Sequence, residues 1–100
     1  MILEAVRGAG KIDQIKIIAF DEEDATLQGI VDGEVAGTIV QNPYRYGFES
    51  VRVLAALERG DESAIPESGF LDIPARKIVK SNVEEFWNEI KDRLAATAAK

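Results

Sequence analysis

Short apolar runs alternate with helix signals along this chain, and that alternation constrains the fold more than any other feature. Ile15–Phe20 is a β-branched and aromatic run of nearly continuous apolar character, as expected of a strand buried on both faces of a parallel sheet. Apolar residues at helical spacing follow it, and Gly37–Gln41 then reads as a second short strand. Strands that alternate with helices predict an α/β fold, an open parallel sheet with flanking helices.

The second half of the chain carries clear helix boundaries. Asn42 is a good N-cap and Pro43 suits the first helical position, so a helix is expected to begin there and to end at Gly60. Residues 61–69 read as a loop, and residues 70–79 as an extended segment that Pro74 interrupts. Ser81–Glu84 matches a capping box. The helix that it opens carries one apolar face, made of Val83, Phe86, Trp87, Ile90 and Leu94.

Composition excludes several classes of function. The net charge is −6 and the basic residues are scattered, so no basic face is expected to bind nucleic acid. The chain has no cysteine and no histidine, which removes disulfides, thiol and imidazole catalysis and zinc sites of the usual kind. No nucleophile–base pair is marked out, so we expect neither an enzyme nor a cofactor. The acidic run Asp21–Asp24 suits a helix N-terminus, where the macrodipole favours it, better than a metal site.

A series of short motifs along the chain resembles a known family. In order, it contains Gly10-Lys11, Ile15–Asp21, Leu27–Gly33, Thr38–Tyr44 followed by Gly47, and Lys80–Val83. This series closely resembles the C-terminal portion of periplasmic sugar-binding proteins of the ribose-binding type, over about residues 1–90. The resemblance implies a partial type I periplasmic-binding-protein fold, in which two α/β lobes enclose a sugar and are joined by a hinge.

The resemblance also implies how the chain is divided. Residues 1–41 would belong to the C-terminal lobe, residues 42–69 to the N-terminal lobe, and residues 70–100 to the hinge return and the final helix. The chain would cross the hinge at Gln41, Asn42 and Pro43. The abrupt, uncapped helix at residues 2–9 suggests that earlier turns of the same helix are missing, as expected of a fragment.

Two residues are candidates for sugar contacts. Asp21 follows a predicted parallel strand, and open α/β sheets place their ligand crevices at the carboxyl ends of such strands. Gln41 ends the next strand, and its amide can donate and accept hydrogen bonds. The resemblance implies that both positions contact sugar hydroxyls. Without the resemblance, the residues favour Asp21 as a cap of the following helix and Gln41 as a solvated strand end.

The function that the resemblance implies is sugar binding for an ABC-type importer. The ligand would be a monosaccharide or a related small polar molecule, and the importer's membrane subunits would be partners of the full-length protein. That protein would be periplasmic or lipid-anchored outside the cytoplasm, although no signal peptide is visible in this chain. The alternatives are the effector-binding core of a lactose-repressor-type regulator and a free-standing α/β module.

A fragment of such a fold would leave apolar surface uncovered. Without the other strands of each sheet, we expect a patch around Leu54, Leu57, Phe86 and Trp87. The chain should therefore associate with itself, and an exchange of elements between copies is one way for it to do so. It should also bind sugar poorly, because it would hold only part of the cleft.

Overall fold

The structure is a computed structural model that describes residues 2–99, and the chain divides into two compact units. The first unit comprises residues 1–40 and 76–100, and the second comprises residues 41–75. Within the described residues, no helix is both long and apolar enough to cross a membrane.

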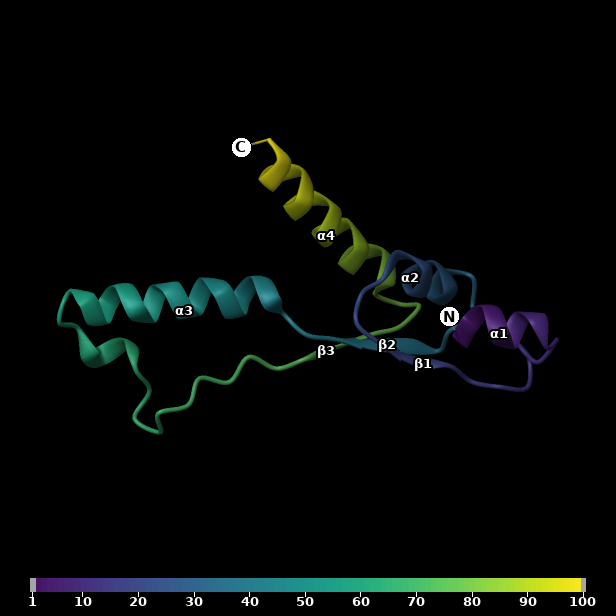
Figure 1. The fold of residues 1–100 in the computed structure, drawn as a ribbon, viewed down its shortest axis with the longest axis horizontal. Coiled ribbons are helices and arrows are strands. Elements are labelled where there is room, and N and C mark those ends of the chain that lie inside the picture. The colour runs from purple at the N-terminus through teal and green to yellow at the C-terminus, as the bar shows by residue number, and fades with distance from the viewer. Residues whose placement is uncertain (1, 100) are drawn as a thin grey trace. The chain divides into compact units, whose positions relative to one another are not determined.

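The first unit is built on a three-stranded sheet with the order β1-β2-β3. Strands β1 and β2 run parallel, with Phe20 opposite Ile39, whereas β3 is antiparallel to β2, with Arg76 opposite Val40 (Figure 1). The elements of this unit are α1 (Ile2–Gly8), β1 (Ile18–Phe20), α2 (Asp24–Val31), β2 (Gly37–Val40), β3 (Arg76–Ile78) and α4 (Val83–Ala98). The predicted α/β class, an open sheet with flanking helices, is confirmed; the sheet was expected to be parallel and is partly so, because β3 is antiparallel.

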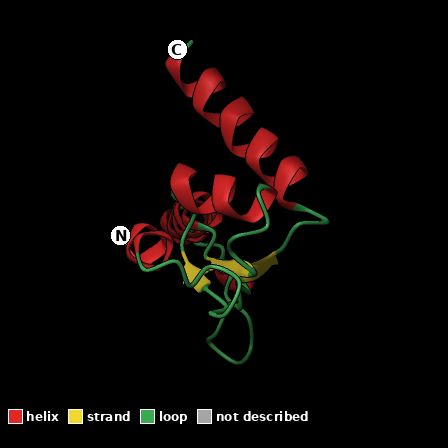
Figure 2. Ribbon diagram, turned by 90° about the vertical axis from the view of Figure 1, so that its right-hand side faces the viewer, coloured by secondary structure: helices red, strands yellow, loops and turns green. Residues whose placement is uncertain are grey.

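The core of the first unit lies on one face of this sheet. Helices α1, α2 and α4 supply side chains to it, and the ribbon shows α2 over the strands (Figure 1 and Figure 2). Its most buried members are Leu27, Ile30, Val40, Ile78 and Val83, each 1% exposed or less. Apolar residues at helical spacing in α2 and α4 and at alternate positions in the strands therefore meet on one side.

The opposite face of the sheet is open, which corrects one expectation. Strand β1 was predicted over Ile15–Phe20 and buried on both faces, but it spans only Ile18–Phe20. Ile17 and Ala19 face the core, whereas Ile18 is 75% exposed and Phe20 is 61% exposed. The reason is that β1 is an edge strand, and no helix of the described part of this unit covers that face.

The capping box predicted at Ser81–Glu84 is wrong. Helix α4 begins at Val83, its N-cap is Asn82, and no side chain caps its amides. The Asn82 side chain instead holds the loop that follows β3. Its Oδ1 accepts from the Val79 amide at 2.8 Å, and its Nδ2 donates to the Lys77 carbonyl oxygen at 3.0 Å. The Asn82 side chain is therefore bonded to the loop and does not cap the helix.

The second unit consists of α3 (Pro43–Glu58), a short 3-10 turn η1 (Glu62–Ala64) and an extended segment up to Ala75. The predicted helix start is confirmed, since Asn42 Oδ1 accepts from the Arg45 amide at 3.0 Å with Pro43 in the first turn. Residues 61–69 contain the turn η1 inside the predicted loop. Residues 70–75 are extended without belonging to a strand, so only the second half of the predicted broken segment pairs in the sheet.

The predicted apolar patch is half confirmed. Leu54 and Leu57 are 65% and 38% exposed on α3. Phe86 is only 7% exposed and belongs to the core, and Trp87 packs against that core, so the patch does not include them. Helix α4 packs on α2 within its own unit, and the indole Nε1 of Trp87 donates to Asp24 at 3.2 Å.

Candidate functional site

Asp21 lies directly after β1, at the edge where the parallel strands β1 and β2 end. Its amide continues the ladder by donating to the Ile39 carbonyl oxygen at 2.9 Å. Its own carbonyl oxygen accepts from the hydroxyl of Thr38 at 2.7 Å, and Thr38 is 1% exposed. Both backbone groups of Asp21 are thereby fixed to β2, while its side chain is exposed.

The backbone of Asp21 is in the left-handed region, with φ of 75°. Among the described residues other than glycine, it is alone in having a positive φ. Such a conformation costs a residue with a Cβ about 1 kcal/mol, and it persists where surrounding contacts enforce it. Sequence reasoning missed Thr38, which supplies one of those contacts. Its signal was a hydroxyl residue within the otherwise apolar strand β2.

The structure does not support the reading of Asp21 as a helix cap. The N-cap of α2 is Glu23, and no side chain bonds to the amides of its first turn. Asp24 accepts a hydrogen bond from the indole of Trp87. The Asp21 carboxylate makes no hydrogen bond or ion pair with any described residue, so it can accept hydrogen bonds from a ligand.

The three predicted hinge residues open the second unit. Gln41 is exposed and follows β2 directly, Asn42 caps α3, and Pro43 is its first residue. The capping role predicted for Asn42 and Pro43 is confirmed. Asp21 belongs to the first unit and Gln41 to the second, so the two candidate ligand residues sit on different units.

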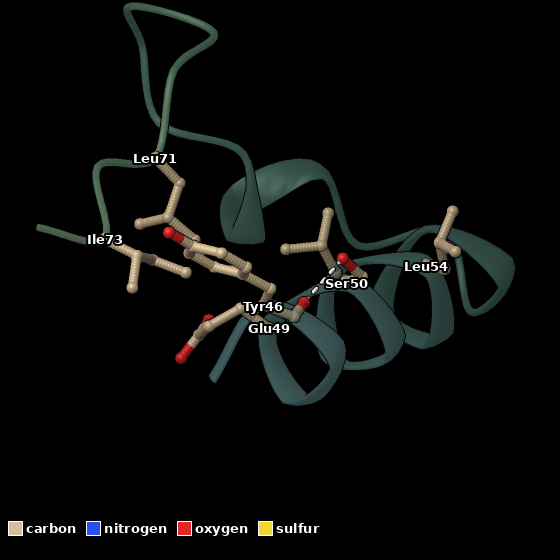
Figure 3. A pocket seen from close by; sticks show the side chains of 7 residues that line it. Tyr46, Glu49, Ser50, Leu54, Leu71 and Ile73 are labelled. Atoms are coloured by element: carbon tan, nitrogen blue, oxygen red, sulfur yellow. Dashed lines mark hydrogen bonds between the residues drawn. The ribbon is translucent and has the colours of Figure 1, made fainter. Parts of the chain in front are cut away.

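A groove lies within the second unit. It has a volume of about 430 Å³ and lies along α3, with Tyr46 beside Leu71 and Ile73 (Figure 3). The hydroxyl of Ser50 donates to the Tyr46 carbonyl oxygen at 2.7 Å, and Glu49 pairs with Arg52. The polar groups that a polyol needs are therefore mostly engaged, and the groove is a poor sugar site. Tyr46 packs in this groove.

Elsewhere in the described residues, the carboxyl groups with a shifted pKa bond to neighbouring side chains within the fold. The Arg7 guanidinium lowers the pKa of the Glu34 carboxyl through a hydrogen-bonded pair between α1 and the loop after α2. Arg76 likewise lowers the pKa of Glu89, and the Ser63 hydroxyl and amide lower that of Asp61. Within residues 2–99, no three His, Cys, Asp or Glu side chains gather as metal ligands would.

Comparison with protein families gives one match. The model of the periplasmic binding protein domain matches residues 1–62 of the chain, which include all of β1, α2 and β2 and the whole of α3. No curated protein matches the chain.

Solved structures that are similar to this chain include the following three. A carbohydrate transporter solute binding protein from Agrobacterium radiobacter, in complex with D-arabinose, is 29% identical with a TM-score of 0.69, over 89% of this chain and 29% of that one. The XylFII–LytSN complex is 32% identical with a TM-score of 0.63, over 79% of this chain and 26% of that one. A mutant of that complex is 32% identical with a TM-score of 0.62, over 81% and 27%. The chain thus spans between 26% and 29% of the length of these solved chains.

Proposed function

The chain belongs to the periplasmic binding protein domain family, and from this premise we propose that it forms part of the cleft of a sugar-binding protein that serves an ABC-type importer. The ligand would be a monosaccharide or a related small polar molecule. The role is binding and not catalysis, and the protein would work outside the cytoplasmic membrane. Importer membrane subunits would be partners of the full-length protein.

The observation that carries this proposal is the geometry of Asp21. Two backbone hydrogen bonds to β2 fix it in a left-handed conformation, and its exposed carboxylate is left without an internal partner. A strained residue at the carboxyl end of a parallel strand is a recurrent mark of a ligand site. A carboxylate can accept bonds from two adjacent hydroxyls, which suits a sugar.

The solved relatives support the choice of a sugar. One of them is a carbohydrate transporter solute binding protein and holds D-arabinose. We propose that the ligand of this chain belongs to the same class of polyhydroxylated molecules. XylFII forms a complex with LytSN. We therefore propose a second protein as a further class of partner for the protein that contains this chain.

The division of the chain supports a two-lobed arrangement. The boundary between the units falls after Val40 and before Arg76, and these two residues pair with each other in the sheet. We propose that the first unit is part of one lobe, that the second is part of the other, and that Gln41, Asn42 and Pro43 form one hinge crossing. Gln41, exposed at this crossing, would be the second ligand contact.

A thermal-shift screen tests the proposal. The longest natural polypeptide that contains these residues would be heated with pentoses, hexoses and inositol. A ligand at a hundred times its dissociation constant should add about 2.7 kcal/mol of stability. The shift should disappear in Asp21→Ala and Gln41→Ala and persist in Asp13→Ala, an exposed acid elsewhere. Stabilisation by none of these molecules would contradict sugar binding and favour the effector-binding core of a transcription regulator.

A further inference from the structure

The indole of Trp87 joins α4 to the start of α2. Its Nε1 donates to the Oδ1 of Asp24 at 3.2 Å, and Asp24 is the first residue of α2. Both helices belong to the first unit and pack on each other there. The N-cap of α2, Glu23, makes no side-chain capping bond. The bond from Trp87 therefore holds a helix start that its own cap residue does not secure.

Two further contacts hold the indole in place. Trp87 packs against the core of the first unit, and the ammonium of Lys91, one turn further along α4, lies 4.5 Å from the centre of the indole ring. A cation over an aromatic ring adds an attraction that depends on how the ring is turned. The indole therefore has a fixed orientation, in which its Nε1–H donor reaches Asp24.

Asp24 lies close to the candidate ligand residue along the chain, since two residues separate it from Asp21. At one end of this segment, the backbone of Asp21 is fixed to β2 by its bonds to Ile39 and Thr38. At the other end, Asp24 is held by α4. A connection of two residues between two fixed ends has few conformations, so both attachments limit the direction in which the Asp21 carboxylate points.

We infer that Trp87 is a positioning residue for the candidate ligand carboxylate, because its bond to Asp24 fixes the segment that begins at Asp21. The inference rests on the proposed function of Asp21 as a sugar contact. Trp87 itself touches no sugar and acts only through the backbone between Asp24 and Asp21. Its contribution to affinity is preorganisation, since a carboxylate already held in its binding orientation loses less conformational freedom when a sugar binds.

A packing role alone makes a different prediction. A side chain that only fills space affects the stability of the first unit and leaves the affinity for a sugar unchanged. A positioning residue affects affinity through its bond to Asp24. Removal of either partner of that bond should then have the same effect, and removal of both should add nothing further.

Isothermal titration calorimetry distinguishes the two roles. It uses the longest natural polypeptide that contains these residues and the pentose, hexose or inositol that stabilises it in the thermal-shift screen. Trp87→Phe keeps an aromatic ring but lacks the donor, and Asp24→Ala lacks the acceptor at an exposed position. Each should raise the dissociation constant about fivefold or more, the lower end of typical coupling between two sites. The double variant should bind as weakly as either single variant and no more weakly.

Two further variants are the controls. Asp24→Asn keeps an Oδ1 acceptor for the indole and should bind as the wild type does. Ile90 packs against the same core from α4, so Ile90→Val should lower the melting temperature without changing the dissociation constant. Should Trp87→Phe fail to fold, as circular dichroism would show, the comparison of Asp24→Ala with Asp24→Asn carries the test.

The outcomes separate this inference from the proposed function. Wild-type affinity in folded Trp87→Phe or in Asp24→Ala, together with weakened binding by Asp21→Asn, would overturn the inference and leave the proposed function standing. Losses that multiply in the double variant, or an equal loss in Ile90→Val, would also overturn it. Undiminished binding by Asp21→Asn and Asp21→Ala, or binding of none of these sugars, would overturn the proposed function and the inference with it.

Discussion

The hydroxyl of Thr38 donates a 2.7 Å hydrogen bond to the backbone carbonyl oxygen of Asp21. Thr38 is 1% exposed in β2, and the bond joins this strand to the residue that directly follows the parallel strand β1. Together with the bond from the Asp21 amide to Ile39, it holds Asp21 in the conformation that presents its carboxylate. The candidate site therefore depends on a buried residue that no ligand is expected to touch.

Replacing Thr38 should destabilise the first unit in proportion to the hydrogen bond lost. Thr38→Val keeps the shape of the side chain but leaves the Asp21 carbonyl oxygen without its donor, which should lower the free energy of unfolding by about 1–3 kcal/mol. Thr38→Ser keeps the hydroxyl and should lose less. Urea denaturation followed by circular dichroism measures the difference. Equal stability of Thr38→Val and the wild type would contradict this role.

The left-handed conformation of Asp21 predicts an unusual order of stability among its variants. Ala should be the least stable of the tested residues, by about 1 kcal/mol relative to Gly, because its Cβ is strained at positive φ. Asn should resemble Asp, since it tolerates this conformation. Thermal unfolding of the three variants checks the order. An Ala variant as stable as the Gly variant would show that the backbone there is not left-handed.

The pair between Arg76 and Glu89 predicts a loss of stability in acid. Arg76 Nη1 donates to Glu89 at 2.9 Å and lowers the pKa of that carboxyl below its ordinary value of 4.5. Ionised Glu89 therefore favours the folded state above about pH 4.5, and the contribution is lost as pH falls through the lowered pKa. Above that range, Glu89→Gln should melt about 1–5 °C below the wild type, as for an exposed ion pair.

The pH series also provides the control for this pair. The difference between wild type and Glu89→Gln should shrink as pH is lowered from 7 to 3, when measured by thermal melts. Asn88→Ala, an exposed position on the same helix without an ionisable side chain, should not show this pattern. A wild-type advantage that stays constant across this range would mean that the pair does not contribute through the charge of Glu89.

Asn82, and not Ser81, should be the sensitive position before α4. Asn82→Ala removes the bonds to the Val79 amide and the Lys77 carbonyl oxygen and should lower the free energy of unfolding by about 1–3 kcal/mol. Ser81→Ala should change it by less than about 0.5 kcal/mol, as for most surface substitutions. Parallel urea titrations compare the two. A larger loss at Ser81 would restore the capping box that the sequence suggested.

Local signals in the sequence predicted the helices well. Asn42 and Pro43 mark the start of α3 because an N-cap and a first-turn proline act within one turn, and Gly60 follows its end. The start of α4 was misjudged by one residue because Ser81 and Asn82 are both good caps. Which of them serves depends on Val79 and Lys77, whose positions β3 sets.

Features that depend on distant residues could not be predicted. The apolar run up to Phe20 indicated a strand, but its burial depends on what covers the sheet and not on the run itself. The antiparallel pairing of β3 with β2 joins segments separated by the whole second unit. Asp21 was singled out by its place after a strand, whereas its left-handed backbone follows from bonds to Thr38 and Ile39 across the sheet.

The central claim is that Asp21 is a ligand residue of a sugar-binding cleft. Isothermal titration calorimetry tests it most directly, with the sugar identified by the thermal-shift screen and the longest natural polypeptide that contains these residues. Asp21→Asn tolerates the same backbone conformation but loses the charge, and it should weaken binding at least about tenfold, or 1.4 kcal/mol. Glu67→Gln, an exposed acid in the second unit, should bind as the wild type does. Undiminished binding by Asp21→Asn and Asp21→Ala would contradict the claim.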